Sequence, residues 1–465
     1  MANETQPTLF PQVESETPST SADKSTKPNA SSGRTPRVNG PQRSQQELRA
    51  ESLDDRLDED HPVRVVWKLV AKLNLDSLYQ QIDAVEGVAG RNASDPRVLF
   101  ALWLYAAVDG VGSARRLERL CNEHRAYEWL RGTVPVNYHM LADFRVQQGE
   151  LLKQLQVDSL AGMLAEGLVS LEMAAQDGMR VRASAGSHSF RRQPTLEEAQ
   201  REAREHLDKL ERESEDDPAG PTLREQKARE RAAREREERV AKALEAVKQM
   251  AEQREKRKQG DGAKARASTT DPDARIMKMG DGGFRPAYNV QMATDVQSGI
   301  ILHMDVINEG SDAGQMKPMV GQIKADLGQA PKILITDGGF STKADIEATT
   351  AAGTIVYTPV KEEEKQKQAG KDPFAPRPGE SPILSAWRKL MGTNEAKELY
   401  KLRAPTAELP NARLRNQGVY QFGVRGLEKV KAVVRWHVLA LNLLRGEVLR
   451  SLGAETAGIP CALAG

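Results

Sequence analysis

The stretch KILITDGGFSTKADI, residues 332–346, places a carboxylate at the end of a strand-like segment, a position where ligand-binding and catalytic residues are common. Residues 332–336 are mostly β-forming and end at Asp337, which two glycines and a helix-like segment follow. Aspartate is a frequent turn and N-cap residue, so a purely structural role is one explanation. Carboxylates at the carboxyl ends of strands in open α/β sheets also hold ligands and metals, which is the second explanation.

A second carboxylate of interest, Asp177, precedes Gly178 and the segment MRVRAS. That segment alternates apolar and basic residues, a pattern typical of a strand. Taken alone, the Asp-Gly pair is a turn signal, but beside a strand it is also a candidate for the functional edge of a sheet. Whether Asp177 and Asp337 meet depends on the order of the strands that carry them.

The chain after residue 171 alternates strand-like and helix-like segments. Strand patterns lie at 287–295, 299–307, 331–337 and 354–360, and helix patterns at 314–328 and 341–353. With residues 196–258 set aside and the helical C-terminus added, the elements follow the order βββαβαβα, which is that of ribonuclease-H-like folds. In such a fold the first and fourth strands are parallel neighbours, so we expect Asp177 and Asp337 to face one another across one crevice.

Residues 196–258 differ from everything around them. Strong helix formers dominate, and glycine and proline are nearly confined to DPAGP at 217–221. Two charged helices joined by that turn form a helical hairpin, which we expect to be inserted in a catalytic domain spanning residues 171–450. Its apolar seam is thin, so a solvated structural insertion is favoured over a dimerisation element or a DNA contact.

The N-terminal part divides into two segments. Residues 1–50 are rich in Ser, Thr, Pro, Gln and Asn, and we expect this tail to be disordered. Residues 55–170 carry apolar residues at helical spacing, with a break at Gly110 and Gly112, and predict an all-α domain. That domain is expected either to bind DNA, as a helix-turn-helix does, or to dimerise.

The composition excludes several classes of protein. The 465 residues carry a net charge of +1, so the overall charge alone does not indicate a nucleic-acid partner. The two cysteines, Cys121 and Cys461, are far apart and form neither a disulfide framework nor a cysteine zinc site. No apolar run is long enough for a membrane span, and the N-terminus lacks the features of a signal peptide. A cytoplasmic protein is expected.

The chain resembles the DDE transposases of bacterial insertion sequences, which join a helical N-terminal domain to a ribonuclease-H-like catalytic core. The matching stretches are QDGMRVRASAGSHSFRR, TDPDARIMKMGDGGFRPAYNVQMATD, ILITDGGFSTKADI and YKLRAPTAELPNARLRNQGVYQFGVRGLEKVKAVVRWHVLALNLLR. The resemblance covers roughly residues 55–450 and depends on the order and spacing of these stretches together. It implies an α/β catalytic core with the charged hairpin inserted, and a DNA transposase activity.

By this resemblance a third acid follows the last strand of the core and maps to Glu408. The family signature, a tyrosine, an arginine, a glutamate and a basic residue at set intervals, is matched by Tyr400, Arg403, Glu408 and Arg415. Pro405 and Pro410 flank Glu408, and because proline disrupts the interior of a helix, we expect the helical C-terminal part to be broken near both. We therefore expect either that Glu408 lies in the first turn of its helix or that the site is damaged.

The resemblance implies a two-metal reaction in which Asp177, Asp337 and Glu408 are both catalytic residues and metal ligands. Mg²⁺, with Mn²⁺ as a substitute, prefers oxygen ligands and keeps several waters, so one or two carboxylates per ion suffice. Two ions about 3.5–4 Å apart activate the attacking oxygen and stabilise the leaving one. Water frees a 3′-hydroxyl at the end of the element, and that hydroxyl attacks target DNA. Carboxylates this close repel one another, so at least one pKa should be raised before metal binds.

Basic residues near these acids are predicted to bind DNA phosphates. They are Arg180, Arg182, Arg191 and Arg192 after Asp177, and Arg403 and Arg415 around Glu408, with Tyr400 positioning the strand. Each neutralised phosphate releases counterions, so binding should weaken steeply with salt. The expected partner is double-stranded DNA, as element end and as target. Two ends must be brought together, so a homodimer or larger assembly on DNA is expected, at the nucleoid.

Two other functions stay open. A related metal-dependent nuclease would use the same acids without joining a 3′-hydroxyl to target DNA. A decayed or repurposed DNA-binding protein would bind DNA without cutting it. A phosphatase is a weaker alternative, because it would need a second acid two residues after Asp337, where Gly339 stands.

Overall fold

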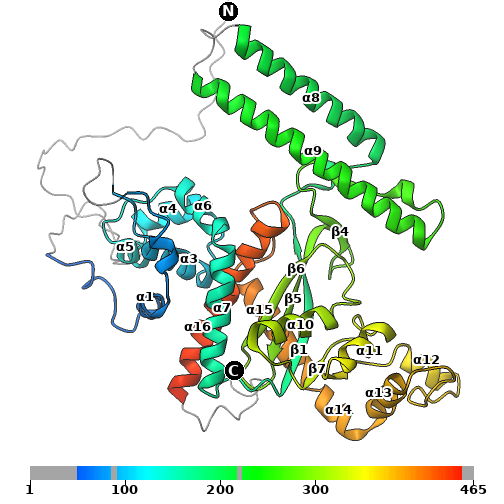
Figure 1. Cartoon of the computed structure of the whole chain (residues 1–465). Helices are drawn as coiled ribbons and strands as arrows, with labels where there is room; N and C mark the ends of the chain where they lie inside the picture. Colours follow the sequence, from blue (N-terminus) through cyan, green and yellow to red (C-terminus); the bar gives the residue numbers. More distant parts are fainter. Residues whose placement is uncertain (1–49, 85–91, 217–222, 453–465) are drawn as a thin grey trace, which may run out of the picture. The chain divides into compact units, whose positions relative to one another are not determined.

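The computed structural model describes residues 50–84, 92–216 and 223–452 (Figure 1). The predicted disordered tail, apart from residue 50, and the predicted turn at 217–221 lie outside the described residues. Within the described part, no helix combines the length and the apolar character that a membrane crossing requires.

The N-terminal region is helical, as predicted. Its helices are α1 (Pro62–Lys72), α2 (Asp76–Tyr79), α3 (Pro96–Val108), α4 (Ala114–Glu123), α5 (Arg125–Arg131), α6 (Tyr138–Gln147) and α7 (Gly149–Ala165). The side chain of Asp95 caps α3, and Pro96 takes the first helical position, where its missing N–H costs nothing. Every residue from Val98 to Ala107 is buried, so α3 forms the centre of this region's core.

A mixed sheet forms the second part of the fold. Its strands in the described residues are β1 (Met173–Arg182), β4 (Arg275–Lys278), β5 (Phe284–Asp295), β6 (Ile301–Ile307), β7 (Ile333–Ile335) and β8 (Ile355–Tyr357). The order is β4-β5-β1-β7-β8, and β6 also pairs with β5. β1 is antiparallel to β5 and parallel to β7, so the predicted parallel pairing of the first and fourth core strands is present. The short strand β4 was not predicted.

The helices α10 (Met316–Leu327) and α11 (Lys343–Ala351) follow β6 and β7 and supply apolar side chains to the sheet's core. Beyond β8 the chain forms α12 (Glu363–Gln368), α13 (Pro382–Gly392), α14 (Asn394–Tyr400) and α15 (Arg403–Asn416). The expected helix break near Pro410 is wrong. The break falls at residues 401–402, and α15 continues through Pro410, which is buried.

The insertion begins and ends at a small sheet that sequence patterns did not predict. β2 (Phe190–Arg191) pairs antiparallel with β3 (Ala267–Ser268), and the helices α8 (Gln193–Asp216) and α9 (Leu223–Arg257) lie between them in sequence. A separate apolar cluster at the base joins both helices to the returning chain: Leu196, Ala243, Leu244, Val247, Ala265 and Ala267. The chain thus leaves and re-enters the core at adjacent points.

The last helix, α16 (Leu427–Leu452), contributes to three apolar clusters. Trp436 and Leu439 pack with the N-terminal helices, Val434 packs under the sheet, and Leu449 packs with the cluster around α10. In Figure 1, α16 lies beside α7. The core of the N-terminal region is therefore completed by the C-terminal helix.

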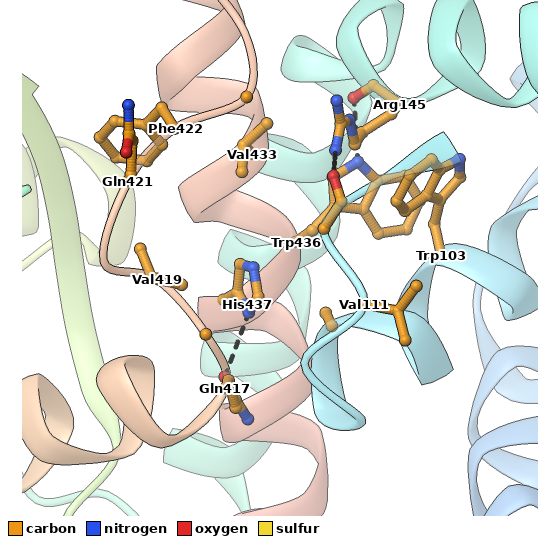
Figure 2. A pocket seen from close by; sticks show the side chains of 14 residues that line it. Trp103, Val111, Arg145, Gln417, Val419, Gln421, Phe422, Val433, Trp436 and His437 are labelled. Carbon is orange, nitrogen blue, oxygen red and sulfur yellow. Dashed lines mark hydrogen bonds between the residues drawn. The ribbon is translucent and has the colours of Figure 1, made fainter. Parts of the chain in front are cut away.

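Figure 2 shows a cavity at the junction of α3, α6, α16 and the loop after α15. The Trp436 indole donates to the Arg145 carbonyl at 3.0 Å, and the Arg145 guanidinium lies over the Trp103 ring. His437 Nδ1 lies 3.2 Å from Gln417 Oε1, and burial lowers the pKa of His437 to about 4. An uncharged imidazole suits this buried position. The cavity therefore belongs to the packing between the N-terminal helices and the C-terminal part of the chain.

Candidate active site

Three carboxylates from three separate elements converge on one guanidinium. Arg403 Nη2 lies 3.3 Å from Asp177 Oδ2 and 3.7 Å from Asp337 Oδ2, and its Nη1 lies 3.6 Å from Glu408 Oε1. The Arg403 side chain is only 16% exposed, so these contacts are partly shielded from water. The structure thus brings together the three acids that the sequence singled out.

The register of β1 and β7 explains why two of these acids meet. The strands pair only over Met173–Ala175 and Ile333–Ile335. Asp177 lies two residues beyond Ala175, and Asp337 lies two residues beyond Ile335. Because side chains alternate with a period of two, equal offsets carry both carboxylates to the same level.

The pairing of β1 with β7 ends at Ala175, so within the described residues the part of β1 from Gln176 onward has no strand on that side. β5 pairs with β1 as far as Arg182, but on the side of β7 the next partner is Gln421, which bridges to Arg182. We call residues 176–181 the open edge of β1. Asp177 lies on this edge, next to the turn that follows β7.

The two carboxylate oxygens of Asp337 make different contacts. Its Oδ1 accepts a hydrogen bond from the Gly339 N–H at 2.7 Å, which is a turn-forming contact. Its backbone carbonyl accepts from the Thr358 hydroxyl at 3.0 Å. Its Oδ2 is the oxygen that approaches Arg403, so one oxygen shapes the turn while the other faces the site.

α15 supplies both Arg403 and Glu408. Arg403 is its first residue, so Glu408 falls in the second turn, and the first of the two expected alternatives is wrong. Pro405 lies in the first turn, where an N–H is not needed. Pro410 lies inside the helix and costs one backbone hydrogen bond. The helix is intact around Glu408, whose side chain is 66% exposed.

Asn411 is a site residue that sequence reasoning missed. Its Nδ2 donates to Asp177 Oδ2 at 3.1 Å, and its Oδ1 is buried without a hydrogen-bond partner among the described residues. It stands three residues after Glu408, which places both side chains on neighbouring positions of one helix face. That spacing was the available signal.

Burial dominates the electrostatics of Asp177. It raises the pKa of this carboxyl to about 6, against the opposing effects of Arg403 and of the Gly178 N–H. Asp337 and Asp312 raise it further because they are negative neighbours. Burial also raises the pKa of Tyr400, which Arg403 counteracts. The site therefore favours an added positive charge, as expected for crowded acids.

The donor atoms suit a hard cation, since they are carboxylate and amide oxygens. Among the described residues, no three His, Cys, Asp or Glu side chains are grouped closely enough to hold a metal ion as they stand. The Arg403 guanidinium lies between the acids instead and is the cation of this arrangement.

The predicted phosphate-binding residues divide into two groups. Arg180 and Arg403 lie at the site, and Tyr400 precedes Arg403 at the end of α14. Arg182 and Arg415 are exposed on β1 and α15. Arg191 and Arg192 lie at the base of the insertion, and no side-chain hydrogen bond or ion pair within the described residues joins them to the acids.

Two family models match the chain. Residues 255–443 match a family described as transposase DDE domain. Residues 51–147 match a family described as a transposase domain (DUF772). Neither a curated protein nor a solved structure matches the chain.

Proposed function

The chain belongs to the DDE transposases of insertion sequences, and we propose that Asp177, Asp337 and Glu408 are the acids that carry its reaction on DNA. The observation that carries this proposal is the shared guanidinium of Arg403, which three carboxylates from β1, the turn after β7 and α15 approach within 4 Å. Acids that share a cation in this way are arranged to share a metal site.

A ribonuclease-H-like core with an inserted helical hairpin is the fold that we propose. Three features support it: the antiparallel run β6-β5-β1, the parallel addition of β7 and β8, and the helices that follow β6 and β7. The position of α8 and α9 between β2 and β3 supports an insertion within the catalytic domain, residues 171–450. The helical domain at 55–170 and the disordered tail at 1–50 remain predictions.

The three acids would hold Mg²⁺, or Mn²⁺ in its place. When bound, such ions activate the attacking oxygen and stabilise the leaving oxygen of a phosphodiester. Asn411 donates a hydrogen bond to Asp177 Oδ2, and the Gly178 N–H donates one to Oδ1 at 2.8 Å. The carboxylate is therefore oriented before any ligand arrives. Arg403 must then leave its central position, and a DNA phosphate is the partner that we assign to it, with Tyr400 beside it.

The proposed reaction has two steps. A water oxygen first bonds to the phosphorus at the element end, and the bond to the 3′-oxygen breaks, so that this oxygen leaves as a hydroxyl. The oxygen of that 3′-hydroxyl then bonds to a phosphorus of target DNA and gives up its proton. The bond from this phosphorus to a target 3′-oxygen breaks, and that oxygen leaves as a hydroxyl. Arg182, Arg191, Arg192 and Arg415 would bind phosphates further along the DNA. Two copies of the chain would hold the two ends, at the bacterial nucleoid.

The test is cleavage of a labelled duplex that carries the ends flanking the chain's own gene. It is run with Mg²⁺, with Mn²⁺ and with EDTA, on the full chain and on Asp337→Asn. The matched control is Asp305→Asn, a β6 carboxylate that binds Lys431 at 2.9 Å, away from the three acids. We expect metal-dependent cutting in the wild type and the control, and none in Asp337→Asn.

Two outcomes would contradict this proposal. Equal DNA binding by all three proteins without any cutting would indicate a DNA-binding protein that has lost catalysis. Cutting without transfer of the 3′-hydroxyl end to a supercoiled target would indicate a nuclease.

A further inference from the structure

Asp312 is a fourth acid beside the site, in the loop between β6 and α10. Its side chain is only 10% exposed, and three donors surround it. Asn289 Nδ2 and Gln291 Nε2 each donate to Oδ1 at 2.7 Å, and Arg180 Nη2 donates to Oδ2 at 2.7 Å. A buried carboxylate with this many donors is held in one orientation.

The glycines of the site make room for Asp312. A Cβ at position 178 would collide with Asp312 Oδ1 and Gln291 Nε2, so this strand position requires glycine. On the turn after β7, a Cβ at Gly339 would lie 3.7 Å from Asp312 Oδ2. Asp312 therefore lies between the open edge of β1 and the turn that carries Asp337.

Asp177 and Asp312 approach the open edge of β1 from opposite faces of the sheet. Side chains alternate along a strand, so Gly178 and Arg180 share one face while Asp177 points to the other, toward α15. Because β7 does not cover residues 176–181, both faces reach the same free edge. A DNA strand lying along that edge would meet the three acids and Arg180 together.

Arg180 keeps donors available for such a strand. Both of its hydrogen bonds use Nη2, one to Asp312 and one to the Gly310 carbonyl at 3.0 Å. Nε and Nη1 have no hydrogen-bond partner within the described residues, and the side chain is 27% exposed. A guanidinium anchored on one side presents its remaining N–H groups in a fixed direction, which suits a phosphate.

We propose that Arg180, anchored by Asp312, binds a DNA phosphate neighbouring the one that is cut, and that Asp312 is the positioning residue for this contact. The inference rests on the proposed function, since it places the DNA strand relative to the three acids. Asp312 touches no DNA itself. It removes the freedom of a long side chain, so that the strand enters the site in one register.

The test combines substitutions with neutral backbone linkages. Single methylphosphonates are placed in turn at each phosphate within three nucleotides of the cut, and binding by the full chain is measured in EDTA at two salt concentrations. The proteins are the wild type, Arg180→Ala, Asp312→Asn and the double variant. Asp295→Asn is the matched control, because Asp295 is a buried carboxylate at the end of β5 that accepts hydrogen bonds from the Ser298 N–H and hydroxyl.

We expect one methylphosphonate position that weakens binding by the wild type and the control about tenfold but leaves Arg180→Ala unaffected. Asp312→Asn should lose most of that discrimination, and the double variant should lose no more than either single variant, because the two residues act as one unit. Where the wild type cuts DNA, its cleavage rate should fall about 10- to 100-fold in both single variants at saturating DNA.

Three results would overturn the inference. The first is that the losses of binding caused by Arg180→Ala and by the neutral linkage add at every position tested. The second is that the losses of the two single variants add in the double variant, and the third is that Asp295→Asn shows the same loss as Asp312→Asn. Thermal unfolding of each variant separates the last case from a folding defect. Binding in EDTA requires no catalysis, so a failure of the proposed function would show as absent cutting with the phosphate contact still present.

Discussion

Replacing Asp177 by asparagine should stabilise the metal-free chain while abolishing cleavage. Burial raises the pKa of this carboxyl from its usual 3.8 to about 6. At ~1.4 kcal/mol per pKa unit, this shift corresponds to roughly 3 kcal/mol of unfavourable free energy for holding the charged form at neutral pH. Asparagine keeps the shape and the acceptor for the Gly178 N–H but carries no charge, so most of this cost should disappear.

The pH dependence has a definite sign. Between pH 3.8 and about 6 the folded chain holds a proton on Asp177 that the unfolded chain has lost. The free energy of unfolding of the wild type therefore falls as pH rises through this window and is flat above it. The advantage of Asp177→Asn should be small near pH 4, grow through the window and level off above pH 6 at ~3 kcal/mol or less.

Urea denaturation in EDTA, followed by tryptophan fluorescence from pH 4.5 to 8, measures this difference. Asp326→Asn is a control of opposite sign, because the His303 hydrogen bond lowers the pKa of Asp326 and its charge stabilises the folded chain at neutral pH. Adding Mg²⁺ should stabilise the wild type and Asp326→Asn, but not Asp177→Asn, by ~2.7 kcal/mol at 100 times the dissociation constant. A pH-independent difference, or a less stable Asp177→Asn, would refute the reasoning.

Three further predictions concern the residues around this site and the core. Arg403→Ala should bind Mg²⁺ about tenfold more tightly in calorimetry without DNA, because a competing cation is gone. This corresponds to ~1.4 kcal/mol of binding free energy. The same variant should cut DNA more slowly. Trp436→Ala should lower the free energy of unfolding by ~3–5 kcal/mol in urea, because the indole is buried against Phe100. Gly178→Ala should displace Asp312 and cost ~1–3 kcal/mol in the same assay, with cleavage lost.

Strand order was the part of the fold that the sequence predicted best. The segment 331–337 is mostly β-forming, and the segment after Asp177 alternates apolar and basic residues. Their topological positions follow from the elements between them. Their parallel pairing carries both aspartates to one edge of the sheet. The short strands β2, β3 and β4 were not predicted, because two to four residues are too few to show an alternating pattern.

The site was predicted less completely than the fold. Asp312 lies in a loop whose sequence, GSDAGQ, has the composition of any turn, and its importance arises from contacts with β5 and β1 that are distant in sequence. The expected disruption at Pro410 was wrong because tertiary packing buries that residue and holds α15 together. Local propensity could not show either effect.

α15 explains how one helix can complete a site begun by two strands. Arg403, Glu408 and Asn411 occupy its first nine residues, so a single rigid element supplies the cation, the third acid and the amide that orients Asp177. Asp177 is fixed by the pairing of β1 with β5, and Asp337 is fixed by its turn contacts with Gly339 and Thr358. Glu408, by contrast, is 66% exposed, and Arg403 contacts the three acids through its charge. The movable partners of the site therefore lie on the helix, and the fixed ones lie on the sheet and on the turn after β7. A cation that takes the place of Arg403 would free the guanidinium and leave the aspartates where the strands put them, so DNA and metal can enter without any change in the sheet.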